Sequence, residues 1–387
     1  MAKYKIGEIC QIVSGSTPKT SVNEYWDGNI KWITPAEISE DTYIVNDSER
    51  KISELAVEKK HMLSFPKGTV ILSSRAPIGK VAIAGCEMYC NQGFKNLICS
   101  NVINNKYLYW FLKGKKDFLN SLGRGATFKE ISKSIISKIE IEVPSKEKQE
   151  DIVEILEKIN IIIKDRNREI CALDDLIKAR FVEMFGNPVL NDRGWKQVPL
   201  GVVTTKIGSG ATPKGGKGAY QESGVTLIRS MNVHNGRFEY KELAHISDEQ
   251  ARKLDNVVME EKDVLLNITG ASVARSCIVP TEILPARVNQ HVCIIRCKEC
   301  IIPEFLNKLL IDDNYQKLLW SIAGSGATRE AITKQQVEKL QIILPPVKLQ
   351  NKYIEFCNQI DKSKVAVQKA LDEAQLLFDS LMQEYFG

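Results

Sequence analysis

The sequence has few histidines and no long apolar run, and we expect no secretory leader. Only 4 of its 387 residues are histidine, and they form no ordered set with a serine or cysteine that could act as a nucleophile. No apolar run approaches the length of a membrane span, and residues 1–8 lack the apolar core of a signal peptide. We therefore expect a soluble, cytoplasmic protein without nucleophilic catalysis of its own.

The 10 cysteines show no sign of a disulfide framework. Without an export signal they are expected to remain reduced thiols. Cys293, Cys297 and Cys300 form the one cluster, with a single Cys-x-x-Cys pair and no second pair at the spacing of a zinc site. We expect buried or idle thiols and no metal bound by this chain.

Signatures of phosphate binding and of DNA chemistry are also missing. In the glycine-rich residues 210–218, five residues rather than four separate the first glycine from the Gly-Lys pair, and Gly218 offers no hydroxyl for magnesium. The chain has no Asn-Pro-Pro-aromatic element of an adenine methyltransferase, and Asn187 before a single proline is typical of a helix end. Asp255 with residues 260–262 imitates the Asp/Glu/Lys group of a metal-dependent nuclease only loosely.

What the sequence does contain is an internal repeat of a whole module. Gly125-Ala126-Thr127 returns as Gly326-Ala327-Thr328, 201 positions later. Both copies continue with a Ser or Thr (Ser132, Thr333), a proline (Pro144, Pro345), a glutamine (Gln149, Gln350) and a Phe-Gly pair (Phe185-Gly186, Phe386-Gly387). A duplicated module implies a pseudo-symmetric protein with two similar surfaces. Duplex DNA is the quasi-symmetric partner that suits such a protein best.

The first part of each copy alternates short apolar stretches with turns, which predicts a mixture of strands and helices. The paired features are Thr-Pro turns (Thr17-Pro18, Thr212-Pro213), apolar strands (30–33 and 225–228, then 69–72 and 263–266), cationic loops (73–80, 267–275), Asn-Gln pairs (Asn91-Gln92, Asn289-Gln290) and helical stretches (107–112, 305–310). The number of residues that separates matching positions of the two copies changes along the module. We therefore expect insertions in the loops, while the strands and helices are kept.

The net charge of +5 is unevenly distributed. Residues 1–145 and 187–345 have more basic than acidic residues, whereas residues 146–186 and 346–387 have more acidic ones. Basic globular parts joined to acidic helices fit nucleic-acid contact by the globular parts. An ordinary solvated surface explains this mild bias almost as well.

A helical period replaces the strand pattern after each proline. Apolar residues then recur every three or four positions over about five heptads, which is typical of a coiled-coil seam. The expected seam positions are Ile152, Ile155, Ile159, Ile162, Arg166, Ile170, Leu173, Leu176 and Arg180 in the first copy, and Tyr353, Cys357, Ile360, Lys364, Val367, Leu371, Ala374, Leu377, Leu381 and Tyr385 in the second. A helix of about 37 residues would be about 55 Å long. The charged seam positions suggest a fixed register or a face that meets other proteins, and a plain intramolecular spacer is the alternative.

Taken in order and twice over, these elements resemble the specificity subunit of type I restriction–modification systems. The resemblance covers essentially the whole chain and rests on the Thr-Pro turns, the Gly-Ala-Thr segments, the proline and glutamine before each long helix, and the final Phe-Gly pairs. The copies differ at several places, for example Arg124 against Ser325 and Phe128 against Arg329. Such differences are expected if the two copies read different DNA.

The resemblance implies a fold, partners and cofactors. The fold class would be α+β, with two pseudo-symmetric target recognition domains separated by two long antiparallel coiled-coil helices. Each domain would read one half of a split, asymmetric DNA site, and the helix length would set the gap. Two modification (methyltransferase) subunits carrying S-adenosylmethionine would dock on the helices. A restriction subunit using Mg²⁺ and ATP could join them, while this chain would bind no cofactor.

The corresponding division of the chain follows the repeat. Residues 1–145 form the first target recognition domain and residues 146–186 the first long helical region. Residues 187–345 form the second recognition domain and residues 346–387 the second helical region. The chain is then a DNA-binding subunit and not an enzyme.

Candidate DNA contacts fall into three groups. Cations in loops after strands or around the Thr-Pro turns are candidates for the DNA backbone: Lys19, Arg75, Lys80, Lys206, Lys214, Lys217 and Arg275. Amide and imidazole side chains in the paired turns are candidates for base edges: Asn91, Gln92, Asn289, Gln290 and His291. Cations beside the Gly-Ala-Thr segments are further phosphate candidates: Arg124, Lys129 and Arg329. For each group the alternative is an ordinary exposed cation or a turn residue.

Two other classes of function remain open at this point. A free-standing nuclease built on Asp255 and residues 260–262 would cleave DNA with magnesium alone. A scaffold that uses its helices for assembly and its globular parts for protein binding would show no salt-dependent affinity for duplex DNA.

Overall fold

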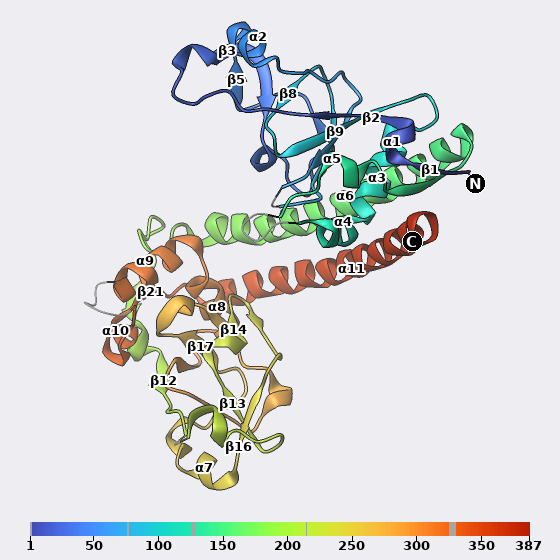
Figure 1. The fold of residues 1–387 in the computed structure, drawn as a ribbon. Helices are drawn as coiled ribbons and strands as arrows, with labels where there is room; N and C mark the ends of the chain where they lie inside the picture. The colour runs from blue at the N-terminus through green and yellow to red at the C-terminus, as the bar shows by residue number, and fades with distance from the viewer. Residues whose placement is uncertain (1, 76, 125–128, 214, 325–329) are drawn as a thin grey trace. The chain divides into compact units, whose positions relative to one another are not determined.

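The computed structural model describes residues 2–75, 77–124, 129–213, 215–324 and 330–387. The chain forms two compact units: unit 1 comprises residues 1–167 and 369–387, and unit 2 comprises residues 168–368. The predicted helical regions correspond to two long helices, α6 (Lys146–Phe185) and α11 (Val347–Phe386) (Figure 1). The division into units cuts across both helices, so each unit holds one globular part and a portion of each helix.

The globular part of unit 1 is built from short strands and helices. Its strands are β1 (Ala2–Lys5), β2 (Cys10–Ser14), β3 (Trp26–Ile33), β4 (Ile44–Val45), β5 (Arg50–Ile52), β6 (Val70–Ser73), β7 (Val81–Ala84), β8 (Tyr89–Cys90), β9 (Phe94–Cys99) and β10 (Glu140–Val143). Its helices are α1 (Ile6–Ile9), α2 (Glu54–Lys60), α3 (Asn105–Gly114), α4 (Lys116–Leu122) and α5 (Lys133–Ile136). A five-stranded sheet has the order β2-β9-β6-β7-β4, a three-stranded sheet has the order β5-β3-β8, and β1 pairs with β10.

The globular part of unit 2 repeats this plan. Its strands are β11 (Gln197–Pro199), β12 (Thr204–Ser209), β13 (Val225–Ile228), β14 (Val233–His234), β15 (Arg237–Phe238), β16 (Ala244–Ile246), β17 (Val264–Asn267), β18 (Ser276–Ile278), β19 (Ala286–Val288), β20 (Val292–Cys297) and β21 (Gln341–Ile343). Its helices are α7 (Asp248–Arg252), α8 (Pro303–Leu310), α9 (Asp313–Gly324) and α10 (Lys334–Lys339). The sheet of order β12-β20-β17-β18 matches the first four strands of the five-stranded sheet of unit 1, and the sheet β16-β13-β19 matches β5-β3-β8. As β1 pairs with β10 in unit 1, β11 pairs with β21, and β14 and β15 form a further two-stranded sheet.

The match extends to strand direction. β3 runs antiparallel to β5 and parallel to β8, and β13 likewise runs antiparallel to β16 and parallel to β19. β6 and β17 are buried along their whole length, which explains why the sequence shows them as continuous apolar runs. The predicted α+β class and the pseudo-symmetry of the two modules are confirmed.

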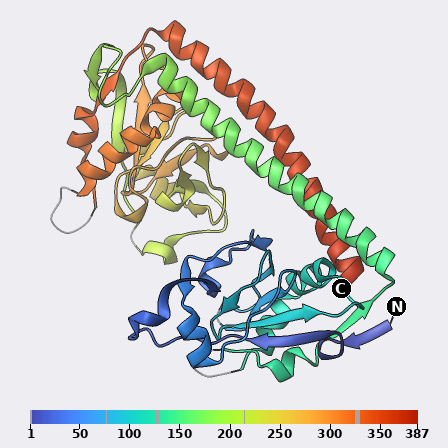
Figure 2. The same cartoon turned by 90° about the horizontal axis from the view of Figure 1, so that it is seen from above.

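Each long helix ends in the core of a globular part. In unit 1 the ring of Phe386 packs against Tyr107 and Phe111 of α3, with ring centroids 5.1 and 6.0 Å apart. In unit 2 Phe185 packs against Phe305 of α8 at 5.0 Å. Edge-to-face contacts of this kind add to the free energy gained by burying the rings. The repeated Phe-Gly pair therefore anchors each helix. Figures 1 and 2 show β1 close to the end of α11 in unit 1.

The two helices run antiparallel. In unit 2 the ring of Tyr353, near the start of α11, contacts Phe181 and Phe185 near the end of α6. In the same unit Lys364 donates to Asp174 at 2.6 Å. In unit 1 the end of α11 shares a hydrophobic core with Ile152 of α6. The antiparallel helix pair that the sequence predicted is confirmed.

The predicted seams of both long helices are partly wrong. On α11, Leu377 was expected in the seam but is 51% exposed. On α6 the mismatch is larger. Ile155, Ile162 and Leu176 were expected in the seam but are 38, 47 and 46% exposed. The buried positions are one residue further along, at Leu156 and Ile177. Helix α6 packs against the globular parts as well as against α11. Its buried side chains therefore do not follow the pattern of a helix that contacts only one other helix.

Candidate nucleic-acid interface

In both units the Thr-Pro turn meets the Asn-Gln turn. In unit 1 the hydroxyl of Thr17, just after β2, donates to the Oε1 atom of Gln92, which lies between β8 and β9. In unit 2 the hydroxyl of Thr212, after β12, donates to Oε1 of Gln290, between β19 and β20. Two predicted site motifs are thus brought together, and they are brought together in the same way in each unit.

The asparagine of each Asn-Gln pair shapes the turn. The Oδ1 atom of Asn91 accepts from the backbone N–H of Gly93 at 2.9 Å, and Oδ1 of Asn289 accepts from N–H of His291 at 3.0 Å. This is the turn geometry that asparagine favours. Asn289 is only 5% exposed, whereas the neighbouring Gln290 is exposed. The glutamine side chain is therefore exposed to solvent, whereas the asparagine is more buried and shapes the turn.

A close backbone approach holds the two turns together. The backbone N–H of Ser16 donates to the carbonyl of Cys90 at 3.0 Å, and N–H of Gly210 donates to the carbonyl of Asn289 at 3.1 Å. A Cβ atom on Gly15 would lie 2.2 Å from the carbonyl oxygen of Cys90, and one on Gly210 would lie 1.8 Å from that of Val288. Only glycine fits at these two positions, which explains the glycines before each Thr-Pro pair.

An ionic cluster lies beside this site in unit 1. Glu130 accepts from Nε of Arg75 at 2.9 Å and from Nζ of Lys95 at 3.2 Å. Desolvation raises the pKa of Glu130, but the hydrogen bonds from Lys95 and Arg75 outweigh it, and the pKa lies below its ordinary value. The Lys95 side chain is 9% exposed and that of Arg75 is 43% exposed. Arg75 is therefore the cation of the cluster that solvent or a ligand can reach more easily.

Unit 2 replaces this ionic cluster by neutral groups. Backbone bridges join Arg75 to Glu130 in unit 1 and Thr269 to Ala331 in unit 2. The hydroxyl of Thr269 is hydrogen-bonded to Nδ1 of His291. We call the hydrogen bond from the threonine hydroxyl to the glutamine Oε1 the clip (Thr17 to Gln92, Thr212 to Gln290). The two units therefore share the clip but differ in the charge of the residues next to it.

The remaining predicted cations are distributed over both units. Lys19, Arg124 and Lys129 are exposed, while Lys80, Lys206 and Arg275 are half-buried. Nζ of Lys80 donates to the carbonyl of Pro35 at 3.0 Å, and burial lowers the pKa of Lys206. Lys214, Arg329 and the Gly-Ala-Thr segments lie outside the described residues, and the side chain of Lys217 is likewise not described.

Three residues of this region were not predicted from the sequence. Glu130 and Lys95 form the ionic cluster with Arg75, and Arg50 stacks on the ring of Trp26 with 3.7 Å between its Cζ atom and the ring centroid. No local sequence pattern indicated these contacts, because the partners in each contact are distant in the sequence. The repeat of Thr17 as Thr212 was visible, but it indicated a turn rather than a hydroxyl donor.

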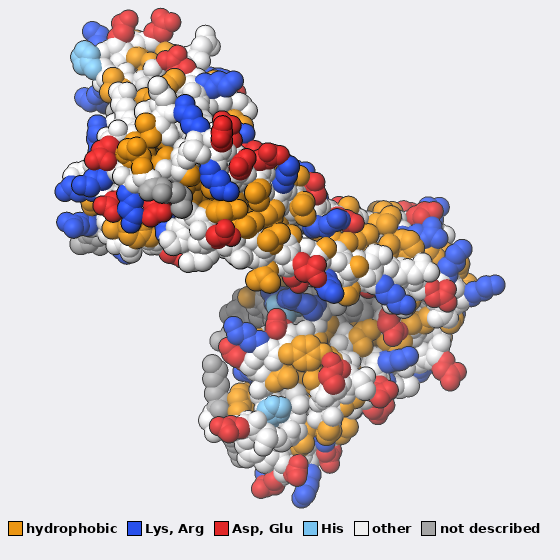
Figure 3. Space-filling model, turned by 90° about the vertical axis from the view of Figure 1, so that its right-hand side faces the viewer, with side chains coloured by type: hydrophobic (Ala, Val, Ile, Leu, Met, Phe, Trp, Pro, Cys, Tyr) orange, Lys and Arg blue, Asp and Glu red, His pale blue; other side chains and the backbone are white. Residues whose placement is uncertain are grey.

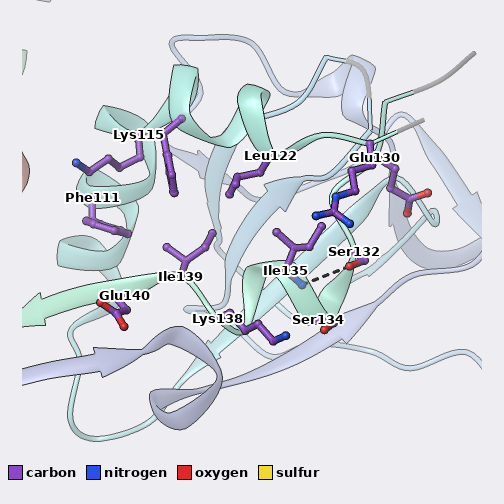
Figure 4. Close-up of a pocket in the computed structure, with 12 residues that line it drawn as sticks. Phe111, Lys115, Leu122, Glu130, Ser132, Ser134, Ile135, Lys138, Ile139 and Glu140 are labelled. Atoms are coloured by element: carbon purple, nitrogen blue, oxygen red, sulfur yellow. Dashed lines mark hydrogen bonds between the residues drawn. The ribbon is translucent and has the colours of Figure 1, made fainter. Parts of the chain in front are cut away.

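A pocket of about 830 Å³ lies in unit 1 beside α5. Figure 4 shows Phe111, Leu122, Ile135 and Ile139 lining it, with charged residues such as Lys138 at the same site. A smaller pocket of about 470 Å³ lies beside α10 in unit 2. Both pockets flank the short helices that Ser132 and Thr333 cap through their side-chain oxygens.

The acidic residues that imitate a nuclease centre bind arginines instead. Asp255 accepts from Arg287 at 3.0 Å, and Glu260 pairs with Arg296. The buried carboxylate of Asp263 binds the same Arg296 at 2.8 and 2.9 Å. Among the described residues there is no group of His, Cys, Asp or Glu arranged to hold a metal ion. These ion pairs explain why acidic residues occur at positions 255, 260 and 263.

Two surface properties bear on partners. On the face drawn in Figure 3, basic and acidic side chains are interspersed on both units. The long helices also carry large apolar side chains that are strongly exposed: Ile161 at 56% and Val182 at 49% on α6, and Val365 at 71% and Leu376 at 72% on α11. These side chains are available for contact with another protein. Over the described residues, no helix is long and apolar enough to cross a membrane.

Comparison with known proteins gives a consistent result. The family model described as "Type I restriction modification DNA specificity domain" matches residues 1–172 and again residues 192–374. The chain is 28% identical over 403 residues to the type I restriction enzyme MjaIX specificity subunit of Methanocaldococcus jannaschii, covering 98% of this chain and 90% of that protein. It is 29% identical over 164 residues to the EcoR124I/EcoR124II specificity subunit of Escherichia coli, covering 41% of this chain and 40% of that protein.

Solved structures support the same fold. The crystal structure of the S subunit of a type I restriction–modification system from M. genitalium matches with a TM-score of 0.60 and 15% identity, covering 100% of this chain and 96% of that one. A structure described as the basis of complex assembly and conformational transition of the type I R-M system matches with a TM-score of 0.64 and 16% identity, covering 100% and 97%.

Proposed function

Because the chain belongs to the family of type I restriction–modification specificity subunits, we propose that it reads a bipartite, asymmetric DNA site and directs methylation there by partner subunits. It is a specificity subunit rather than a catalytic one. Each globular part would read one half of the site in duplex DNA. The proposal places the chain in the cytoplasm, where the DNA is.

The observation that carries this proposal is the repeated site. Thr17 with Gln92 and Thr212 with Gln290 form the same exposed arrangement at the same place in two pseudo-symmetric units. Charged and neutral groups next to the two sites differ, as at Glu130 and Ala331. Two similar surfaces with different details are what two readers of different half-sites require.

The partner subunits would dock on the long helices. Two modification subunits would bind S-adenosylmethionine and transfer the methyl group, and a restriction subunit would add Mg²⁺- and ATP-dependent cleavage. The exposed apolar residues Ile161, Val182, Val365 and Leu376 support a docking surface on α6 and α11. In this proposal the chain itself binds DNA and protein but no cofactor.

The lengths of α6 and α11 would fix the gap in the site. Each helix has 40 residues. At a rise of 1.5 Å per residue this corresponds to roughly 60 Å, which exceeds one turn of DNA at about 34–36 Å. A pair of such helices can therefore act as the spacer between two half-site readers.

Methylome sequencing tests the proposal directly. Cells that express this chain with its neighbouring methyltransferase are compared with cells that lack only this chain. We expect one split, asymmetric motif that is methylated on both strands. If a soluble complex forms and no new motif appears, the proposal fails, and a scaffold that binds protein becomes the better explanation.

A further inference from the structure

The glutamine of each Asn-Gln turn has a role that its neighbours do not share. We propose that Gln92 and Gln290 each donate an amide N–H to the sugar–phosphate backbone of its half-site, and that Thr17 and Thr212 are positioning residues for them. This inference rests on the proposed function, because it requires each unit to bind one half-site. Beyond the proposed function, the inference names the groups that would bind the DNA backbone independently of the base sequence.

The hydrogen bond from threonine decides which end of the amide is free. The hydroxyls of Thr17 and Thr212 donate to Oε1 of their glutamines, so Nε2 is the end that remains for a ligand. Nε2 of Gln92 has no partner among the described residues. Nε2 of Gln290 lies 3.1 Å from Nε2 of His291, and its second N–H remains available. A phosphate oxygen accepts such a donor.

A base edge is a poorer fit for the same group. Glutamine recognises adenine by using Oε1 and Nε2 together. Here Oε1 already accepts from threonine, so one of its two lone pairs is used and the bond restricts how the amide can turn toward a base. The exposed glutamines therefore offer free N–H donors, and phosphate oxygens are acceptors for them.

The repeat supports a contact that is independent of sequence. The clip is the same in both units, although the residue after the glutamine changes from Gly93 to His291. The ionic cluster around Glu130 is likewise absent at the corresponding Ala331. What two different half-sites have in common is the DNA backbone, so the groups that both units share are suited to bind it.

The clip also lowers the entropy lost on binding. A glutamine side chain has several rotatable bonds, and ordering such a side chain at an interface costs about 0.5–1.5 kcal/mol. Thr17 and Thr212 order it in advance. Loss of the threonine hydroxyl should therefore weaken DNA binding even though that hydroxyl touches no DNA.

The experiment uses the complex of this chain with its methyltransferase subunits. DNA affinity is measured at several salt concentrations for Gln92→Ala, Gln92→Glu, Gln290→Ala and Thr17→Val, and the methylated motif is determined for each. Gln92→Glu can still accept from Thr17 but has lost the N–H donors, so it separates DNA contact from the structural clip. Exposed Gln11 on β2 supplies the matched control, Gln11→Ala.

We expect Gln92→Ala and Gln290→Ala to weaken binding about 3- to 10-fold at every salt concentration, the effect of one hydrogen bond. The slope of log affinity against log salt should stay unchanged, because no charge is lost. Gln92→Glu should weaken binding further, because its carboxylate repels phosphate. Thr17→Val should weaken it less, and Thr17→Ser should restore it. The methylated motif should be the same in all of them.

Three results would overturn the inference. A motif that loses one base in Gln92→Ala would make Gln92 a base reader. Wild-type affinity in Gln92→Glu would make the clip purely structural, as would equal affinity of Gln92→Ala and Gln11→Ala. If the wild-type complex methylates no motif and binds no DNA, the proposed function itself fails, which is a separate outcome.

Discussion

Gln149 and Gln350, one repeat apart, make the same three hydrogen bonds. Oε1 of Gln149 accepts from N–H of Asn104 at 2.7 Å, and its Nε2 donates to the carbonyls of Val102 and Pro144. For Gln350 the corresponding partners are N–H of Ile302 and the carbonyls of Cys300 and Pro345. Both side chains are completely buried. Each joins the start of a long helix to the loop before α3 or α8.

The first prediction concerns these glutamines. Gln149→Met should lower the free energy of unfolding by roughly 3 kcal/mol, because it leaves buried backbone groups without a partner. Thermal or denaturant unfolding of the purified chain measures the loss. Gln11→Met, at an exposed position, is the control and should change stability by less than about 0.5 kcal/mol. Equal stability of the two variants would show that the buried bonds contribute nothing net.

The second prediction is a pH dependence. Lys95 and Arg75 hold the pKa of Glu130 below its ordinary value of 4.5. A carboxyl with a lowered pKa stabilises the fold above its ordinary pKa, and this contribution is lost as the pH falls through the folded-state pKa. Glu130→Gln should therefore lower stability at pH 7 by about 1 kcal/mol, a value reduced by solvent screening because the carboxylate is 34% exposed.

The same variant should differ less from the wild type as the pH falls below 4.5, because the wild-type carboxyl then becomes neutral as well. Unfolding measured between pH 3 and pH 7 tests this. A difference between Glu130→Gln and wild type that is constant over this range would contradict the assignment of the ionic cluster.

The third prediction uses the thiols. Cys171 on α6 and Cys300 before α8 are exposed, whereas burial raises the pKa of Cys90, Cys277 and Cys293 to about 12. The thiolate is the reactive form, so iodoacetamide should modify Cys171 and Cys300 in the native chain and the other three only after unfolding. Mass spectrometry of the alkylated protein reads this out.

Adding the modification subunits should then slow the alkylation of Cys171, because the proposed docking surface includes α6. Cys300 lies in a loop outside the helices and serves as the internal control. If Cys171 reacts at the same rate in the free chain and in the complex, docking does not cover that part of the helix.

The fourth prediction concerns the spacer. Inserting one heptad into both α6 and α11 lengthens each helix by about 10 Å. The gap in the methylated motif should widen while both half-sites keep their sequences. Insertion into α6 alone is the informative control, because it shifts the helix register and should abolish methylation. An unchanged gap in the double insertion would end the spacer interpretation.

The sequence predicted those parts of the structure that depend on local pattern. The apolar runs at 69–72 and 263–266 correspond to β6 and β17, and the helical stretches at 107–112 and 305–310 lie in α3 and α8. Helix α6 ends as predicted, because Gly186 adopts a φ of 73° that favours glycine and Pro188 follows. Such signals are contained in neighbouring residues.

Features that depend on distant partners were not predicted. The hydroxyl of Thr17 binds a glutamine 75 positions away, and that of Thr212 one 78 positions away. The seam of α6 was misplaced at Ile155 because the helix packs on more than one neighbour. In each case the deciding contact joins residues that no single window of sequence contains.

Unit 1 is assembled from two separate stretches of the chain. This has a consequence for the order in which the two units can fold during synthesis. Its hydrophobic core includes Phe386, at the end of the last helix, beside Ile152 and Tyr107. Unit 2 needs only one continuous stretch, residues 168–368. A ribosome releases residues in sequence, and domains usually fold first at the N-terminal end. Here unit 1 must wait for residues 369–387 to emerge, so unit 2, which needs only residues 168–368, can complete its core before unit 1.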